Sequence, residues 1–138
     1  MRITAKNTIA IVIDYQEKLV PVMSASEELI RKSKILLEGL HALEIPMIVT
    51  TQYAKGLGGT VSEIVDVVGD APVIDKTTFS VFASHDVRDL IPKGTKNILI
   101  CGMEAHICVM QSIIDLQEAG YQTVMVADCV SSLSLIHI

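Results

Sequence analysis

Cys108, Asp14 and Lys76 give this 138-residue sequence the side chains of a nucleophile, a proton acceptor and a cation. Each follows a short apolar run of the length of a buried strand. A cysteine thiolate attacks carbonyl carbons, and a carboxylate can take the thiol proton and later deliver it to a leaving amine. A nearby ammonium group favours the thiolate. These residue types predict covalent acyl-transfer chemistry, provided that the fold brings them together.

The local sequence around Cys108 favours an anion at this position. Residues 102–110 are expected to join a buried strand to a helix, with Cys108 in the first helical turn. Unpaired N–H groups and the positive end of the helix dipole stabilise negative charge there. Together with the Lys76 ammonium, they predict a thiol pKa below its ordinary value of about 8.5. The same backbone amides could hold the oxyanion of a tetrahedral intermediate.

Each of these residues also has an ordinary structural interpretation. Free cysteine is among the most buried residue types, so Cys108 could belong to the core. Asp14 could be a turn residue at a strand end, and Lys76 could be a solvated surface charge. The other two cysteines, Cys101 and Cys129, are predicted to be core residues, and a place at the pocket rim stays open for Cys129.

Apolar runs alternate with helical patterns along the whole chain. Strands are expected at residues 8–13, 47–51, 72–75, 97–102 and 123–127, and helices at about 25–43, 60–69, 84–91 and 107–119. The first helix is expected to begin at a capping box formed by Ser24 and Glu27. This alternation predicts a three-layer α/β/α fold, Rossmann-like, with a mostly parallel sheet and right-handed crossovers. Ligands bind beyond the carboxyl ends of such strands, where Asp14, Lys76 and Cys108 fall.

Composition excludes several classes of function. Half of the residues are hydrophobic, yet the apolar runs are far shorter than the roughly 18 residues of a spanning helix, so no membrane partner is expected. The net charge of −5 argues against a nucleic-acid partner. Three cysteines without paired spacing predict reduced thiols, and the first residues lack the features of a signal peptide. We therefore expect a cytoplasmic protein.

Three segments resemble a known family. Residues 13–16, 75–80 and 102–109 resemble, in order and spacing, the signature regions of isochorismatase-like cysteine hydrolases. That family is related to nicotinamidases and N-carbamoylsarcosine amidases. The resemblance covers residues 7–132, and the segment around the cysteine is its most specific part. It implies an isochorismatase-type α/β fold and a hydrolase.

The resemblance also implies roles for individual residues. Asp14 would be the proton shuttle, Lys76 would stabilise the thiolate, and Cys108 would form a covalent thioester, which makes these residues a catalytic triad. A non-proline cis peptide between Met103 and Glu104 would direct the Glu104 amide, with that of Cys108, at the oxyanion. A small-molecule substrate, no cofactor and a homo-oligomer of the full-length protein are implied as well.

Two departures from related families narrow the expected activity. Nicotinamidases bind a metal through an Asp-x-His-x-x-His pattern after the second strand, whereas residues 50–55 contain no carboxylate or histidine. We therefore expect no metal. Isochorismatases proper lack the nucleophilic cysteine, so Cys108 argues against isochorismate as the substrate.

Several residues beside the triad are candidates for the pocket lining. Gln16, Gln52, Tyr53 and Phe79 are predicted to contact substrate, although Phe79 could equally be core. His106 lies two positions before the cysteine, whereas facing partners on a helix lie three or four positions apart. A Cys–His pair is therefore not expected.

The last residues depart from the family pattern. Residues 1–132 are predicted to form one hydrolase domain that lacks the last strand and helix of the family fold, and 133–138 are predicted to be a non-native tail. Two function classes stay open: a metal-independent cysteine hydrolase, and a non-catalytic oligomerising or binding module with the same fold. A nucleotide-binding domain is disfavoured because no phosphate-binding fingerprint follows any strand.

Overall fold

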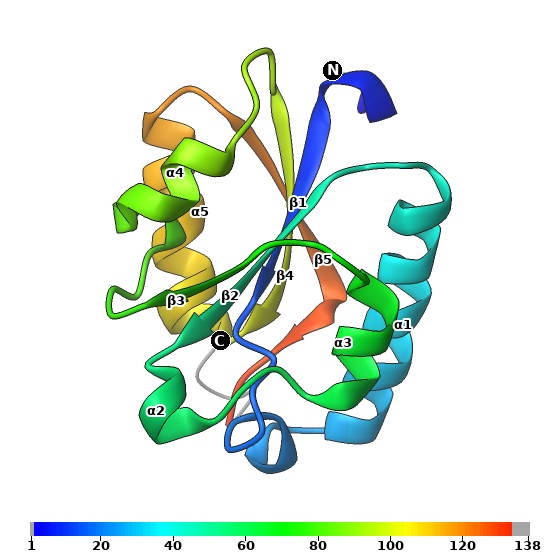
Figure 1. Ribbon diagram of the computed structural model, residues 1–138, viewed down its shortest axis with the longest axis vertical. Helices are drawn as coiled ribbons and strands as arrows, with labels where there is room; N and C mark the ends of the chain where they lie inside the picture. The colour runs from blue at the N-terminus through cyan, green and yellow to red at the C-terminus, as the bar shows by residue number, and fades with distance from the viewer. Residues whose placement is uncertain (1, 134–138) are drawn as a thin grey trace.

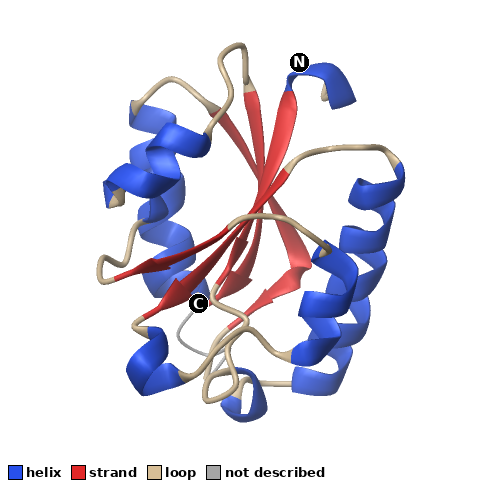
Figure 2. Cartoon of the chain, in the orientation of Figure 1, coloured by secondary structure: helices blue, strands red, loops and turns tan. Residues whose placement is uncertain are grey.

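The computed structural model describes residues 2–133 and contains a five-stranded parallel sheet between two layers of helices (Figure 1). The strands are β1 (Thr8–Ile13), β2 (Met47–Gln52), β3 (Val73–Lys76), β4 (Asn97–Met103) and β5 (Gln122–Ser131), in the order β3-β2-β1-β4-β5. The helices are α1 (Ser26–Ala42), α2 (Ala54–Leu57), α3 (Ser62–Val68), α4 (His85–Leu90) and α5 (Met110–Glu118). Helices α1 and α3 cover one face of the sheet, and α4 and α5 cover the other (Figure 2). The predicted three-layer α/β/α fold is confirmed.

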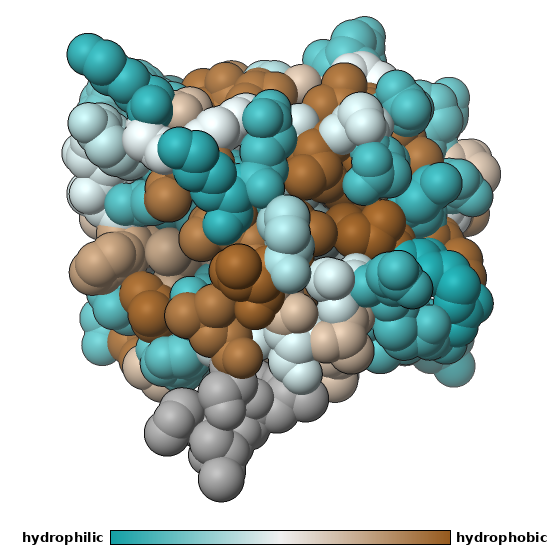
Figure 3. All heavy atoms as spheres, turned by 90° about the horizontal axis from the view of Figure 1, so that it is seen from below, coloured by the Kyte–Doolittle hydropathy of each residue, from teal (hydrophilic) through white to brown (hydrophobic). Residues whose placement is uncertain are grey.

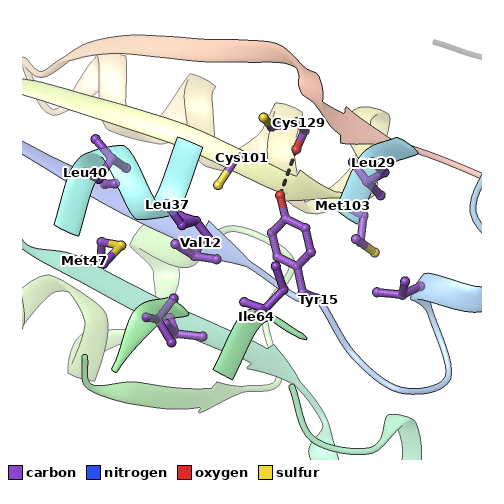
Figure 4. Packing of buried hydrophobic residues seen from close by; sticks show 14 of the residues in the cluster. Val12, Tyr15, Leu29, Leu37, Leu40, Met47, Ile64, Cys101, Met103 and Cys129 are labelled. Atoms are coloured by element: carbon purple, nitrogen blue, oxygen red, sulfur yellow. Dashed lines mark hydrogen bonds between the residues drawn. The ribbon is translucent and has the colours of Figure 1, made fainter. Parts of the chain in front are cut away.

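Two apolar cores flank the sheet because successive side chains of a strand point to opposite faces. On central strand β1, Ile9, Ile11 and Ile13 pack toward α4 and α5, whereas Val12 packs toward α1 and α3. All six residues of β1 are buried, as expected of a strand that is covered on both faces. Figure 4 shows the second core, where the Tyr15 hydroxyl donates to the Cys129 carbonyl oxygen. Each fully buried isoleucine contributes about 1.5–3 kcal/mol.

The carboxyl ends of the strands meet at the edge of the sheet beside α2 (Figure 1). Strand pairing sets this edge: Ile13 lies opposite Thr50 of β2 and Gly102 of β4, and Gln52 lies opposite Lys76. Figure 3 views the molecule from this end, where apolar side chains gather in patches between polar ones. The register therefore brings residues from four separate chain segments to one edge.

Two local predictions were wrong. The capping box at Ser24 does not form: Ala25 precedes α1 with φ +50° and no side-chain cap. The Ser24 amide instead donates to the Ser132 carbonyl oxygen, so the start of α1 is attached to the end of β5. The helix after β4 also begins differently, because a π-helical turn at Ala105–Val109 precedes α5.

Strand β5 lies at one edge of the sheet. Its outer residues and α5 line an apolar groove formed by Ala105, Met110, Ile113, Ile114, Met125, Ala127 and Val130. Of the predicted non-native tail, only Leu133 falls within the described residues. No helix among residues 2–133 is both long and apolar enough to cross a membrane.

A pair of glycine-to-alanine substitutions tests the close approach of β1 and β4. Gly102 has φ +123°, and a Cβ atom there would overlap the Ile13 carbonyl oxygen. Gly102→Ala should therefore lower the free energy of unfolding by at least about 1–3 kcal/mol, the cost of a strained backbone conformation. Gly39 lies in α1 with no atom within 4 Å of an added Cβ. Gly39→Ala should raise that free energy by about 1 kcal/mol. Denaturant unfolding measures the free energy of unfolding of both variants. Equal changes in the two variants would contradict the predicted close approach of β1 and β4 at Gly102.

Candidate active site

The side chains of Asp14, Lys76 and Cys108 meet at the carboxyl edge of the sheet. Lys76 Nζ lies 3.0 Å from Asp14 Oδ2 and 3.7 Å from Cys108 Sγ. The exposed fractions of the three residues are 0%, 3% and 6%, respectively, so the cluster is almost fully removed from solvent. The structure thus brings together the three residues selected from sequence, and Lys76 is not a solvated surface charge.

Each member is positioned by the end of a different strand. Asp14 directly follows β1 in a left-handed conformation, with φ +57°, and its Oδ1 accepts a hydrogen bond from Thr50 Oγ1 at 2.8 Å. Lys76 is the last residue of β3. Cys108 lies in the π-helical turn after β4, where the Glu104 carbonyl oxygen accepts from two later amides of the turn. Rigid strands rather than loops therefore set the relative positions of the carboxylate and the ammonium.

Lys76 is the centre of the hydrogen-bond network. Besides Asp14 Oδ2, its Nζ donates to Gln52 Oε1 at 2.7 Å and to the Thr78 carbonyl oxygen at 3.1 Å. An ammonium group has three protons, and these three oxygens use all of them. The contact with Cys108 Sγ is therefore mainly electrostatic. A buried ammonium needs such complete pairing because an unpaired buried charge is strongly destabilising.

The protonation state of Cys108 differs from the prediction. Burial, and after it the negative charge of Asp14, raise the pKa of the Cys108 thiol to about 12, although the positive charge of Lys76 lowers it. The direction of this shift is opposite to the predicted low pKa. The prediction counted the helix N-terminus and the Lys76 ammonium, but it left out the burial of the thiol and the effect of the Asp14 charge on its pKa. At neutral pH the sulfur carries its proton until another group removes it.

A second cluster holds Glu104 beside the cysteine turn. The Met103–Glu104 peptide is cis, as the resemblance implies. Ser132 Oγ donates to Glu104 Oε2 at 2.9 Å and lies 3.2 Å from His106 Nδ1. Since the hydroxyl proton is given to Glu104, the contact with His106 needs a proton on Nδ1. His106 thus interacts with Ser132 and Glu104, in agreement with the expectation that it does not pair with the cysteine.

Of the four predicted pocket residues, Gln16 and Gln52 make hydrogen bonds within the protein, whereas Tyr53 and Phe79 are half exposed. Gln16 is fully buried; its Nε2 donates to the carbonyl oxygens of Gln52 and Gly58, and its Oε1 accepts from the Gln52 amide. Its polar atoms are thus used to hold the backbone, which replaces the predicted pocket contact. Tyr53 and Phe79 are each 53% exposed, so the alternative of Phe79 as a core residue is wrong.

Three partners of the site were missed from sequence: Thr50, Thr78 and Ser132. The side chain of Thr50 and the carbonyl oxygen of Thr78 contact the charged pair, and Ser132 contacts Glu104. Thr50 could have been found, because it is the polar residue of β2 that lies opposite the last residue of β1. The other two depend on backbone geometry in loops that no residue pattern reports.

Other hollows of the surface lie away from the triad. One is at the amino ends of the strands and includes Lys6, Lys93 and Lys96 in its lining. Another is the α5–β5 groove. Within residues 2–133, no group of three or more histidine, cysteine, aspartate or glutamate side chains could hold a metal ion. The prediction of a metal-independent site still rests on the sequence at residues 50–55.

Removing one charge of the pair should destabilise the fold. Lys76→Met leaves the buried Asp14 carboxylate without its cation, and we expect the free energy of unfolding to fall by about 3–5 kcal/mol. The double variant Asp14→Asn/Lys76→Met removes both charges and should recover a large part of this loss. Denaturant unfolding of the single and double variants measures the coupling. Additive losses would mean that the two side chains do not depend on each other.

Removing the carboxylate alone should make the thiol more acidic. In Asp14→Asn the negative charge that raises the Cys108 pKa is gone, while Lys76 remains. Alkylation by iodoacetamide at pH 8 should therefore be several-fold faster than in the wild type, although the substitution removes the proposed proton acceptor. Cys101 is 1% exposed and is the internal control, which should stay unlabelled in both proteins. Slower labelling of Cys108 in the variant, as read by peptide mass spectrometry, would contradict this interpretation.

Comparison with known proteins finds relatives that are longer than this chain. The secreted isochorismatase effector Isc1 of Phytophthora sojae is 36% identical over 136 residues, which are 95% of this chain and 65% of the relative. Isochorismatase domain-containing protein 1 of Salmo salar is 36% identical over 129 residues, which are 93% of this chain and 45% of the relative. The chain thus spans between 45% and 65% of the length of these two relatives.

Solved structures share the fold. The MAR1 ribonuclease of Caenorhabditis elegans superposes with a TM-score of 0.92 at 38% identity, over 99% of this chain and 70% of that one. The YcaC protein of Escherichia coli, an octameric hydrolase of unknown specificity, gives a TM-score of 0.91 at 20% identity, over 99% of this chain and 69% of that one. At this identity, the YcaC comparison bears on the fold alone.

The match to a domain family covers almost the entire chain. The isochorismatase domain aligns with residues 8–136, which include all five strands and the Asp14, Lys76 and Cys108 cluster. Together with relatives of 36% identity, this match extends the sequence resemblance beyond the three short motifs. The chain belongs to the isochorismatase family.

Proposed function

We propose that this chain is a metal-independent cysteine hydrolase that cleaves a small amide or a related carbon–nitrogen bond through a thioester on Cys108. The observation that carries the proposal is the contact of one buried ammonium, Lys76 Nζ, with both Asp14 Oδ2 and Cys108 Sγ. This arrangement puts a nucleophile, a proton acceptor and a balancing cation within reach of one carbonyl group.

The first half of the proposed reaction forms the thioester. Asp14 takes the thiol proton while the Cys108 sulfur bonds to the substrate carbonyl carbon, whose oxygen becomes an oxyanion. The backbone amides of Glu104 and Cys108 are the proposed donors to this oxyanion. The carbon–nitrogen bond then breaks, and Asp14 returns the proton to the leaving amine. The products of this half are a free amine and an acyl group on sulfur.

The second half regenerates the enzyme. A water molecule gives a proton to Asp14 and adds to the thioester carbonyl carbon. The carbon–sulfur bond breaks, and the sulfur leaves with the proton that Asp14 returns. The carboxylic acid product departs, so the sum of both halves is hydrolysis with no net change in Asp14 or Cys108.

The high thiol pKa is compatible with this sequence of steps. A thiol that holds its proton in the free protein is protected from adventitious alkylation and oxidation, because the thiolate is the reactive form. Asp14 accepts hydrogen bonds from Thr50 and Lys76, and each carboxylate oxygen keeps a further lone pair for the thiol proton. The thiol then loses its proton to Asp14 as the sulfur attacks the carbonyl carbon of the substrate. The positive charge of Lys76 balances the negative charge of the site during both steps.

Residues around the cluster are proposed to bind the substrate. Glu104 contributes its amide to the oxyanion. Gln52 is the last residue of β2, and Tyr53 and Phe79 lie in the segments that follow β2 and β3. The two aromatic side chains are half exposed and can pack on a small organic molecule. Gln16 supports this region indirectly, since it holds the backbone of Gln52.

Two other functions compete with this proposal. A binding or oligomerising module with the same fold would keep the buried pair for stability alone. The similarity to the MAR1 ribonuclease suggests RNA cleavage as another candidate function. The net charge of −5 disfavours RNA, because phosphate backbones are bound by basic surfaces. An RNA oligonucleotide therefore belongs in the substrate panel as the arm expected to give no cleavage.

Assembly and location are part of the proposal. A homo-oligomer of the full-length protein is expected from the family resemblance, and YcaC is an octamer of the same fold. A cytoplasmic location stays a prediction that rests on the three free cysteines. One relative, Isc1, is a secreted protein, so location within the family varies.

Mass spectrometry and an amide panel test the proposed reaction. Wild-type protein mixed with small primary amides should release ammonia and carry a transient acyl group on Cys108. Cys108→Ala should lower turnover by at least about a thousandfold, because the covalent route is lost. Cys101→Ala, which changes a buried cysteine on the other face of the sheet, is the matched control and should keep activity. Turnover that survives Cys108→Ala would contradict the mechanism, and absence of turnover with every amide would favour the binding module.

A further inference from the structure

Gln52 is held by separate partners at its backbone and at its side chain. Its amide donates to Gln16 Oε1 at 2.6 Å, and its carbonyl oxygen accepts from Gln16 Nε2 at 2.9 Å. Its side-chain Oε1 accepts from Lys76 Nζ at 2.7 Å. The three partner atoms belong to buried side chains, since Gln16 and Lys76 are 0% and 3% exposed. The carboxamide of Gln52 therefore has little freedom to turn.

The chemistry of Lys76 fixes which end of this carboxamide faces it. An ammonium group has protons to donate and no lone pair to accept with. The oxygen of the Gln52 carboxamide must therefore point at Lys76, and the NH₂ group must point away from it. This assignment follows from donor and acceptor properties and does not depend on how the two atoms are distinguished.

The NH₂ group of Gln52 is a free donor beside the nucleophile. Among the hydrogen bonds of residues 2–133, Gln52 Nε2 donates to no protein atom, and the residue is only partly buried. The carboxamide oxygen and Cys108 Sγ contact the same nitrogen, Lys76 Nζ, at 2.7 and 3.7 Å. The Gln52 carboxamide and the sulfur therefore flank the same ammonium group.

We propose that Gln52 is a specificity-determining residue whose NH₂ group donates to a second carbonyl oxygen of the substrate, a few bonds from the carbonyl that Cys108 attacks. The substrate class is then a small amide with a second, neutral carbonyl group, such as a diamide. This inference rests on the proposed hydrolase function, which it deepens by adding a requirement on the part of the substrate that does not react.

The charges around Gln52 favour a neutral acceptor over a carboxylate. The positive charge of Lys76 is already balanced by Asp14 at 3.0 Å. A substrate carboxylate would thus meet a neutral donor beside an ion pair that is already balanced, and a charge without a counter-ion is costly in a partly buried site.

Two amides of similar shape provide the test. Succinamide has a second carboxamide where 4-methylpentanamide has an isopropyl group, so the pair differs in the proposed acceptor. In the wild type, kcat/KM for succinamide should exceed that for 4-methylpentanamide by about twentyfold: a factor of two from its two equivalent amides and about tenfold from one hydrogen bond. Succinamate should be a poorer substrate than succinamide.

Gln52→Glu separates the two ends of the carboxamide. The variant has the same shape and keeps an oxygen that accepts from Lys76, while the NH₂ donor becomes a second acceptor. The ratio of kcat/KM values should fall from about twentyfold to about twofold or less, whatever happens to the absolute rates. An unchanged ratio with both values lowered equally would mean that Gln52 only positions Lys76, which would overturn the proposal.

A binding measurement keeps the test independent of turnover. Calorimetric titration of Cys108→Ala with the same two amides should give an affinity about twentyfold higher for succinamide, since its two equivalent amides count in binding as well. The double variant Cys108→Ala/Gln52→Glu should keep only about twofold of this difference. Equal affinities in Cys108→Ala would overturn the role of Gln52. A difference in affinity of about twentyfold without any wild-type turnover would instead refute the hydrolase function and support the donor role of Gln52.

Discussion

The rest of the site depends on one buried ion pair, between Lys76 and Asp14. Their charged atoms are 3.0 Å apart, and both side chains are at most 1% exposed. Such a pair is stable only if the other lone pairs and protons are also satisfied, and Thr50, Gln52 and Thr78 satisfy them. The pair also sets the electrostatics at the sulfur, since one partner raises and the other lowers the pKa of Cys108.

The parallel sheet makes this pair possible. Its strands end at a common edge, and their register is fixed by apolar residues that are buried on both faces. A charged residue directly after such a strand is desolvated by the cores on either side but is still next to the end of the neighbouring strand. The packing of the apolar layers therefore positions the side chains at the strand ends. The proposed chemistry uses these positions, which the stability of the sheet fixes in any case.

The fold and the members of the site could be predicted from sequence to different extents. The period of the apolar runs is a local property, so the strands and the strand-end positions of Asp14 and Lys76 could be predicted from it. The contact of Ser132 with Glu104 could not, because it joins residues 28 positions apart through the register of β5 on β4. The pKa of the Cys108 thiol was expected to fall, whereas burial and Asp14 raise it. Sequence could not report this, because burial is a property of the assembled core. A sequence motif identifies a thiol beside a cation, but it does not report how much water remains around the thiol.

The central claim is that the free protein holds a neutral thiol beside a charged pair. The most direct measurement is a pH titration of the ¹³Cβ resonance of Cys108 in protein with ¹³C-labelled cysteine, with Cys108→Ala used to assign the signal. The account predicts a thiol resonance at pH 7 that does not move until the pH is well above 9, in line with a pKa raised to about 12. A thiolate resonance at pH 7 would contradict it, because the Lys76 ammonium would then outweigh both burial and the Asp14 carboxylate.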